Sequence, residues 1–572
     1  MSEKLLESLK TEFGGLEAGA QAGDAWVRVA RERLHDVVRH LKERAGCSLL
    51  LDVTGVDLSA HPDHLDDPDR FEVNYNLRSL DLGERLMVKV AVEEGQDLPT
   101  VSDLFRSADW AEREVYDLVG VEFRGHPDLR RILCHHEFEG HALRKDYPIE
   151  RGQFLSAPEK LLDDHEVARA SARSNTATDL QMPSDLLTLN IGPSHPATHG
   201  ALRAECLMDG ETIVKAKTEI GYLHRCFEKE AEDHTWSQVM PYTDRLNYVS
   251  AMLNNCIYAA SVEKMLGVTP PPRARAIRVV VSELSRIIDH LVCICANLVD
   301  VGALTNYWYF YNVREGIYYD IIEPLCGSRL TTNYARIGGL SHDVFEGFED
   351  AVTRHLDKMR VAIDEVTGLV ARNRIFLDRT VGVGAVSAEA ALDWGFTGPC
   401  LRASGVPYDL RKHEPYDGYD ELDFDVPVGE NGDSRDRIMV RIEEMFQSER
   451  IIRQILGRGL PEGPIQVDDP AVALPPKADV YGSIEGVMNQ FKLIYEGIQV
   501  PKGEVYGRGE GANGELGFHC VSDGSGCPYR VKVRPPCFPI FSSFASLIEG
   551  LMIPDAVAIL GSINIIAGEL DR

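Results

Sequence analysis

The chain has 572 residues, enough for several domains, and its 44% apolar and 26% charged residues are ordinary proportions for a globular protein. With 60 basic against 90 acidic residues the net charge is −30, which argues against nucleic acid or a bare anionic membrane as the main partner. The longest apolar stretches fall short of the ~18 uncharged residues of a membrane span, and the N-terminus lacks the apolar segment of a signal peptide.

Residues 1–150 are predicted to form a small α+β domain. An apolar stripe over Asp24–Gly46 predicts an amphipathic helix, and the apolar run Cys47–Val53 predicts a buried strand. Apolar and polar residues then alternate over Phe71–Arg78 and Arg85–Glu93, as they do in strands with one buried face. A helix followed by neighbouring strands is typical of an α+β fold.

Two stretches of this domain, Trp110–Leu133 and Gly140–Pro148, are dense in charges of both signs. They could dock a partner, or their charges could pair within the domain, and composition favours neither. The following segment, 151–183, is polar, rich in Ser, Ala and Thr and poor in aromatic residues. We therefore interpret it as a linker with one short helix at Pro158–Arg173.

Residues 184–572 are predicted to form a second, mainly α-helical domain with a small N-terminal β-sheet. The strands are expected at Leu186–Asn190, Ala201–Met208 and Thr212–Ile220, with Asp-Gly as the turn between the last two. Long segments with helical apolar periodicity then predict helices at Arg245–Gly267, Ala274–Val301, Val352–Asn373 and Asp436–Leu456.

The stretch GPSHPATHG, residues 192–200, carries two histidines four residues apart, His195 and His199. That spacing suits a metal site on a helix, but Pro193 and Pro196 oppose a helix through the pair, and the flanking strands predict a hairpin tip. Two ordinary hydrogen-bonding histidines explain the stretch equally well. The twelve cysteines add no metal framework, since no two form a Cys-x-x-Cys pair, and reduced thiols are the expectation.

Further polar positions lie in the second domain. Arg225 belongs to the charged stretch Gly221–Asp233, which a solvated surface would explain equally well. Tyr248 follows Arg245 at the start of a predicted helix, where a tyrosine most often packs with its hydroxyl at the surface. Asp300 ends a long apolar helix and needs a partner there, unless it caps the next turn.

Longer motifs make the chain similar to respiratory complex I, the proton-pumping NADH–quinone oxidoreductase. The stretch Trp110–Pro148 resembles the signature of its C subunit, and Leu189–Arg572 resembles its D subunit. The D-like motifs, in chain order, are LNIGPSHPATHG, IGYLHRCFEK, PYTDRLNYVS, DVGALT, GPCLRASGV, SDGSGCPYRVKVRPP and GSINIIAGELDR. The chain is thus identified as a member of the fused C/D subunit family found in some bacteria.

In that family the D part is related to the [NiFe]-hydrogenase large subunit, which binds its metals through four cysteines. The corresponding positions here are Asn247, Ser250, Ile566 and Glu569. Without thiolates a nickel–iron centre has no ligands, so the resemblance implies an emptied metal site and no metal in this chain. It also implies that the chain itself binds no cofactor, because partner subunits hold the FMN and the Fe–S clusters.

In complex I the emptied region holds the quinone headgroup. The resemblance assigns the headgroup contacts to His199 and Tyr248, makes Asp300 the partner of His199, and leaves His195 as a supporting neighbour. Reducing a quinone to a quinol adds two electrons and two protons, and an imidazole and a phenol can each donate a proton to one quinone oxygen. Arg225 is similar to an arginine near the terminal Fe–S cluster, and Arg245 to one beside the pocket.

The resemblance further implies that NADH reduces quinone with coupled proton translocation. The implied partners are the B subunit, which holds the terminal Fe–S cluster, the I subunit and the membrane arm, and the implied location is peripheral, on the cytoplasmic side of the bacterial inner membrane. Three alternatives stay open: a hydrogenase large subunit, which the missing cysteines oppose, a non-catalytic assembly scaffold, and a quinone reductase whose electron donor is ferredoxin or a deazaflavin. Ubiquinone and menaquinone both fit.

Three residues depart from the family's pattern. Cys226 stands where relatives usually have Gly, Asn247 where many have Asp, and Thr331 where relatives usually have a His near the cluster. The change at Asn247 removes a charge next to Tyr248. The change at Thr331 removes the group that links the cluster's potential to pH.

Overall fold

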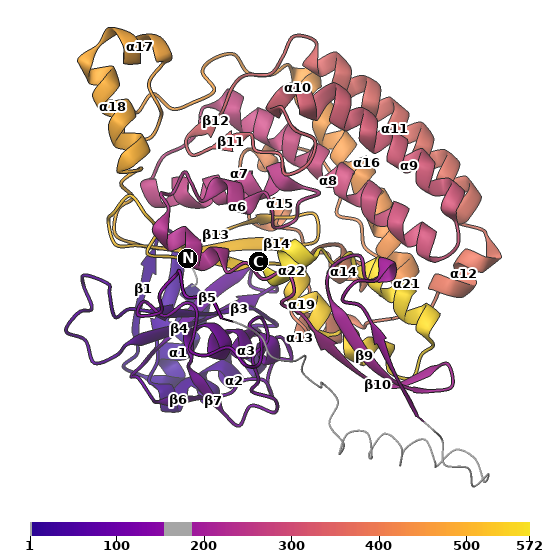
Figure 1. Ribbon diagram of the computed structural model, residues 1–572, viewed down its shortest axis with the longest axis horizontal. Helices are drawn as coiled ribbons and strands as arrows, with labels where there is room; N and C mark the ends of the chain where they lie inside the picture. The colour runs from indigo at the N-terminus through magenta and orange to yellow at the C-terminus, as the bar shows by residue number, and fades with distance from the viewer. Residues whose placement is uncertain (1–2, 154–185) are drawn as a thin grey trace.

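The computed structural model describes residues 3–153 and 186–572 of the chain (Figure 1). All but the first three residues of the predicted linker, 151–183, lie outside the described residues, and so does the helix predicted at Pro158–Arg173. The described chain combines an N-terminal mixed α/β region with a mainly helical C-terminal region that also contains small sheets. The predicted fold class is confirmed at that level.

The N-terminal region is built on a five-stranded sheet in the order β1-β2-β5-β4-β3, in which β2 runs parallel to β5 and the other neighbours are antiparallel. Its strands are β1 (Glu17–Gln21), β2 (Asp24–Arg28), β3 (Leu49–Asp57), β4 (Phe71–Ser79) and β5 (Glu84–Val92). The helices are α1 (Glu3–Phe13), α2 (Leu34–Glu43) and α3 (Ser107–Val119), and two short strands, β6 (Asp97–Pro99) and β7 (Glu122–Arg124), pair in parallel. Helix α3 packs on β3.

The helix predicted over Asp24–Gly46 is wrong in its first part. Residues 24–28 form strand β2, a 3-10 turn follows at Arg31–Arg33, and α2 begins only at Leu34. The apolar side chains at the start of this stretch also fit a period of two, because Ala25 and Val27 are buried while their neighbours are half-buried. Pairing with β5 then favours the strand.

Strands β4 and β5 match the predicted positions, but the expected exposed face is wrong. Every residue of β4 is buried, including Asn74, Asn76 and Arg78. The polar face is covered by the C-terminal sheet, and Arg85 of β5 donates to Glu515 of that sheet at 2.8 Å. One sequence in isolation shows a polar face and cannot show that a second layer covers it.

The C-terminal region begins with the predicted antiparallel strands, β8 (Leu187–Ile191), β9 (Arg203–Asp209) and β10 (Thr212–Glu219), in the order β10-β9-β8. A second sheet near the chain's end comprises β13 (Gly503–Glu510), β14 (Glu515–Ser522) and β15 (Arg530–Arg534). This second sheet lies between the N-terminal region and the helices (Figure 1). A two-stranded ladder pairs β11 (Ala335–Arg336) with β12 (Gly339–Leu340).

Five long helices form the body of the C-terminal region: α7 (Ala251–Leu266), α8 (Pro272–Asp300), α9 (Leu304–Ile317), α11 (Phe348–Val370) and α16 (Ser434–Arg458). Helix α8 packs against α7, α9 and α16, and α7 also packs on β13. The shorter helices are α5 (Phe227–Glu230), α6 (Met240–Thr243), α10 (Glu323–Cys326), α12 (Arg374–Thr380), α13 (Ala388–Asp393), α14 (Gly398–Ala403), α15 (Leu410–His413), α17 (Lys477–Gly482), α18 (Ile484–Tyr495), α19 (Cys537–Ser542), α20 (Phe544–Ile548), α21 (Ile553–Ile563) and α22 (Ala567–Asp571). Within residues 3–153 and 186–572, every helix is too short or too polar to cross a bilayer.

The two regions share one hydrophobic core. Trp110 of α3 meets Phe538 and Phe541 of α19 with ring centroids 5.3 and 5.9 Å apart, in edge-to-face geometry. Strands β8–β10 and helices α19–α21 belong to the same buried cluster as the first sheet. The dense charges around Trp110–Leu133 therefore serve internal pairing and contact between the regions, as in the ion pair of Arg131 with Asp117 at 2.8 Å.

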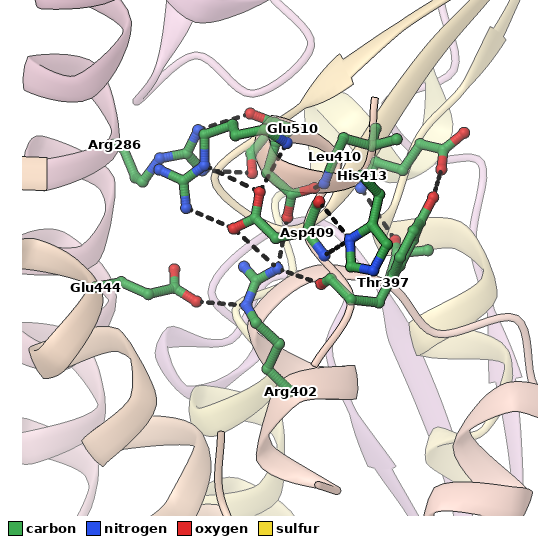
Figure 2. A network of polar contacts seen from close by, with 12 residues as sticks. Arg286, Thr397, Arg402, Asp409, Leu410, His413, Glu444 and Glu510 are labelled. Atoms are coloured by element: carbon green, nitrogen blue, oxygen red, sulfur yellow. Dashed lines mark hydrogen bonds and ion pairs between the residues drawn. The ribbon is translucent and has the colours of Figure 1, made fainter. Parts of the chain in front are cut away.

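Buried charges hold the helices against the C-terminal sheet (Figure 2). Arg402 Nε lies 2.8 Å from Glu444 Oε1 of α16, and Arg402 Nη1 lies 2.8 Å from Glu510 Oε1 of β13. Arg286 of α8 donates to the backbone carbonyl of Glu510 at 2.7 Å. Because an unpaired buried charge is costly, these contacts fix α8 and α16 relative to β13.

Candidate functional site

The GPSHPATHG loop joins β8 to β9 and contains a single 3-10 turn, Pro196–Thr198. His195 Nδ1 accepts from the backbone N–H of Ala197 at 3.1 Å, so the exposed His195 caps this turn. The Oγ1 of Thr198 lies 2.6 Å from the His195 carbonyl and stabilises the same turn from inside. The supporting position predicted for His195 thus has a structural role in this loop.

His199 leaves the turn in the left-handed backbone region, with φ of 52°. Its Nε2 lies 2.8 Å from Asp300 Oδ2, and both side chains are mostly buried, at 19% and 12% exposure. Asp300 is the last residue of α8, where a carboxylate faces the negative end of the helix dipole, so a cationic group beside it is stabilising. The predicted partnership of these two residues is present, across about one hundred residues of chain.

Tyr248 does not begin a helix, contrary to the prediction from periodicity. Helix α6 ends at Thr243 and α7 starts at Ala251. Asn254 Nδ2 donates to the carbonyls of Thr243 and Asn247 at 3.1 and 3.0 Å, and these side-chain bonds hold the chain in a turn where helical bonds would otherwise form. Tyr248 therefore sits on a loop, half-buried.

The start of α22 joins the Tyr248 loop to the His199 loop. A Cβ on Gly568 would lie 2.5 Å from the Arg245 carbonyl and 3.5 Å from Tyr248 Cδ1. A Cβ on Gly200 would lie 2.8 Å from Ala567 Cβ, so the histidine loop packs on the neighbouring residue of the same segment. Residues from three distant parts of the chain thus meet at Ala567–Gly568.

Burial raises the pKa of Tyr248, and the nearby groups Asp289 and Cys537 raise it further. A phenol in this state is a neutral donor at physiological pH. The His199–Asp300 pair and Tyr248 therefore present two proton donors from separate loops.

Two of the four positions that the resemblance aligns with hydrogenase cysteines, Asn247 and Glu569, belong to a buried polar cluster. Glu569 Oε2 lies 3.2 Å from both Cys537 Sγ and Asn513 Nδ2. Burial raises the pKa of Glu569 to about 7. All twelve cysteines are free, and within residues 3–153 and 186–572 no group of three or more His, Cys, Asp or Glu side chains is arranged to hold a metal ion.

Sequence reasoning missed three members of this cluster, Asp289, Asn513 and Asn564. Asn564 Nδ2 lies 2.8 Å from Asp289 Oδ1 and 2.6 Å from Asn513 Oδ1. The available signal was a polar side chain inside an apolar run, in RIIDHL and in GSINIIAG. Buried polar groups need partners, and such positions therefore mark internal networks.

Arg225 and Arg245 lie together beside the Tyr248 loop. Arg225 Nη2 donates to the Arg245 carbonyl at 3.0 Å, and the Arg225 backbone N–H donates to the carbonyl of Arg572 at 3.3 Å. Burial and the Arg245 cation lower the pKa of Arg225. Cys226, next in sequence, has φ of 52°, a conformation that explains why glycine suits this position in the resembled family.

Comparison with known proteins places both regions of the chain. Residues 300–572 match the family described as "Respiratory-chain NADH dehydrogenase, 49 Kd subunit", and residues 27–153 match "Respiratory-chain NADH dehydrogenase, 30 Kd subunit". The chain is 50% identical to the C/D subunit of NADH-quinone oxidoreductase from Bdellovibrio bacteriovorus, over 96% of its length and 95% of the relative. It is 40% identical to the C/D 2 subunit of the same enzyme from Aquifex aeolicus, over 100% of its length and 98% of the relative.

A third relative covers the C-terminal region alone. The D subunit of NADH-quinone oxidoreductase from Myxococcus xanthus is 50% identical over 69% of this chain and 94% of that relative. Two families that each match one region therefore meet in a single chain, as they do in the C/D relatives. The chain belongs to the C/D subunit family of NADH-quinone oxidoreductase, and it is a subunit of that enzyme, complex I.

Proposed function

We propose that the C-terminal region forms the quinone headgroup site of complex I, with His199 and Tyr248 as the groups that bind and protonate quinone. The observation that carries the proposal is the 2.8 Å contact of His199 with Asp300, in a loop that packs on the same α22 segment as the Tyr248 loop. Asp300 orients the imidazole and offsets its charge when it is protonated.

The proposed chemistry is the conversion of one quinone, two electrons and two protons into one quinol. The electrons come from NADH through the flavin and Fe–S clusters of partner subunits, and this chain binds no cofactor of its own. As negative charge develops on the two quinone oxygens, Tyr248 donates its hydroxyl proton to one and His199 donates a ring proton to the other. Both donors are then reprotonated, a step that the proposal couples to proton translocation.

The proposed surroundings follow the family resemblance. The B subunit, which holds the terminal Fe–S cluster, sits against the face that carries Arg225 and Arg245, and the I subunit and the membrane arm are the other partners. The chain works as a peripheral protein on the cytoplasmic side of the bacterial inner membrane. Its C-terminal region descends from the fold of the [NiFe]-hydrogenase large subunit, and the polar cluster at Glu569 occupies the place of the lost metals.

Tyr248→Phe and His199→Ala in the purified enzyme test the proposal. Each variant should lower NADH-driven quinone reduction at least about a hundredfold, the contribution expected of a general acid. Electron transfer from NADH to an artificial acceptor should stay unchanged, because it bypasses the quinone site. Tyr481→Phe, at a side chain that is 89% exposed, is the matched control and should change neither activity. Normal quinone reduction in both site variants would refute the assignment.

A further inference from the structure

The carboxylate of Asp289 is buried next to the Tyr248 loop without an ion-pair partner. Asp289 lies on α8, about three turns before Asp300, and is 1% exposed. Its Oδ2 accepts from Asn247 Nδ2 at 2.7 Å, and its Oδ1 accepts from Asn564 Nδ2 at 2.8 Å. Among the described residues no Lys, Arg or His forms an ion pair with it, so two neutral amides alone hold this carboxylate.

This carboxylate changes what the departure at Asn247 means. The sequence predicts that Asn247 removes a charge next to Tyr248. The structure returns a charge to the same place from helix α8, because Asp289 accepts a hydrogen bond from the Asn247 amide itself. Asp289 in turn raises the pKa of Tyr248, of Cys537 and of Glu569.

Contacts of the neighbouring residue His290 and of Asn247 fix the position of Asp289. The next residue on α8, His290, lies 2.8 Å from Glu444 through its Nε2. Arg402 pairs with the other oxygen of Glu444 (Figure 2). Asn247 is held in turn, since its own side-chain oxygen accepts from the Val249 N–H at 3.2 Å. A movement of the Asp289 carboxylate would therefore displace the turn that carries Tyr248.

We propose that Asp289 is a positioning residue of the quinone site: it fixes the Asn247–Tyr248 turn and places a negative charge beside the Tyr248 phenol. This inference rests on the proposed function of Tyr248. The amides of Asn247 and Asn564 transmit position, and Asp289 acts on quinone only through Tyr248. The titratable groups that face the carboxylate come from the surrounding elements: His290 and Cys293 of α8, Arg441 of α16, Tyr318, Tyr248, Cys537 of α19 and Glu569 of α22.

Arg441 is the one permanent cation in that set. Its Nη1 donates to the carbonyls of Ser562 and Arg437 at 2.6 and 3.1 Å, and its Nη2 points to the Cys400 sulfur at 3.7 Å. All of these hydrogen bonds go to groups other than Asp289. The charge of Asp289 therefore acts on Tyr248 without a direct counter-ion.

The structure supplies a charge-relocation test in the whole enzyme. Asp289→Asn removes the charge. The NH2 group of the new amide then faces the NH2 group of either Asn247 or Asn564, so one of the two hydrogen bonds is lost. The double variant Asn247→Asp, Asp289→Asn restores both contacts, because the carboxylate introduced at position 247 accepts from the new amide, whose oxygen accepts from Asn564. It also returns the charge to the position beside Tyr248. Asp468→Asn, at an exposed carboxylate, is the matched control.

Removing a nearby negative charge lowers the pKa of a phenol. In Asp289→Asn the alkaline limb of the quinone-reduction pH profile should therefore move to lower pH by about one pH unit, and activity measured on that limb, at a pH above the Tyr248 pKa, should fall by up to about tenfold. The double variant should recover the wild-type limb, while transfer from NADH to an artificial acceptor and the Asp468→Asn profile stay unchanged. A profile in Asp289→Asn that matches wild type, or a double variant that stays shifted, overturns the inference.

Tyr248→Phe separates this inference from the proposed function. If that variant keeps normal quinone reduction, the proposed function fails and the inference fails with it. If Tyr248→Phe is inactive while Asp289→Asn behaves as wild type, the inference alone fails. Should Asp289→Asn not assemble, the double variant decides: a wild-type alkaline limb supports the role of the charge, and a shifted limb overturns it.

Discussion

Glu114 on α3 forms two buried ion pairs with residues of the C-terminal region. Its Oε1 lies 2.6 Å from Lys532 Nζ and its Oε2 lies 2.6 Å from Arg572 Nη2, and the side chains are 4%, 2% and 2% exposed. The nearest other carboxylate to Lys532 is Asp52, at 3.8 Å. Glu114→Gln would leave two buried cations to share one amide oxygen, with the amide hydrogens turned toward an ammonium group.

The size of this effect follows from the burial. Breaking a buried ion pair by neutralising one partner costs about 3–5 kcal/mol. At about 2.1 cal/mol/K of unfolding entropy per residue, a chain of 572 residues that unfolds as one unit loses roughly 0.8 °C per kcal/mol, so the unfolding midpoint should fall by about 2–4 °C. The loss should appear as joint unfolding of both regions, because α3 shares one core with helices α19, α20 and α21.

Thermal unfolding of the full chain, followed by circular dichroism, measures this. Glu122→Gln removes the same charge from an exposed position of β7 and should leave the midpoint within about 1 °C. The double variant Glu114→Gln, Lys532→Met also removes one of the two cations left without a carboxylate. It should therefore recover about half of the fall in the unfolding midpoint. If Glu114→Gln has the same unfolding midpoint as the Glu122→Gln control, the reasoning from buried charge is wrong.

Two further predictions concern the site. Gly200→Ala places a Cβ 2.8 Å from Ala567 Cβ and pushes the histidine loop outward, so we expect about tenfold slower quinone reduction; Gly368→Ala, with open space around it in α11, should be as active as wild type. The pKa of Glu569 is raised from 4.5 to about 7, so the folded chain binds a proton that the unfolded chain releases. The contribution of Glu569 to stability should therefore be greatest below pH 4.5 and fall by about 3 kcal/mol as the pH rises from 4.5 to 7. Denaturant titrations from pH 5 to 8 give the free energy of unfolding at each pH. This free energy should fall less steeply with pH in Glu569→Gln than in the wild type, and equal slopes would contradict the raised pKa.

Local patterns predicted the elements that depend on near neighbours. The hairpin β9–β10 follows from Asp209-Gly210 between alternating runs, and α8, α11 and α16 follow from long apolar periodicity. The same rules failed at Asp24–Arg28 and at Arg245–Ser250. In the first stretch a strand partner in β5 overrode an ambiguous period, and in the second the side chain of Asn254 took the carbonyls that a helix would have used.

For the candidate site, motif resemblance identified His199, Tyr248 and Asp300 from the sequence, and the prolines of the loop already opposed a shared metal. Chain order alone could not bring His199 to Asp300, because strands β9 and β10, helix α7 and the whole of α8 lie between them in the chain. It could not reveal that Asp289 replaces the charge missing at Asn247 either. Such contacts arise where helices pack, and packing depends on the whole core, in which residues far apart in sequence become the nearest neighbours. Local sequence motifs therefore determine the residue types and the chemistry of this site. Its charge distribution depends on how α8, α22 and the two loops pack together.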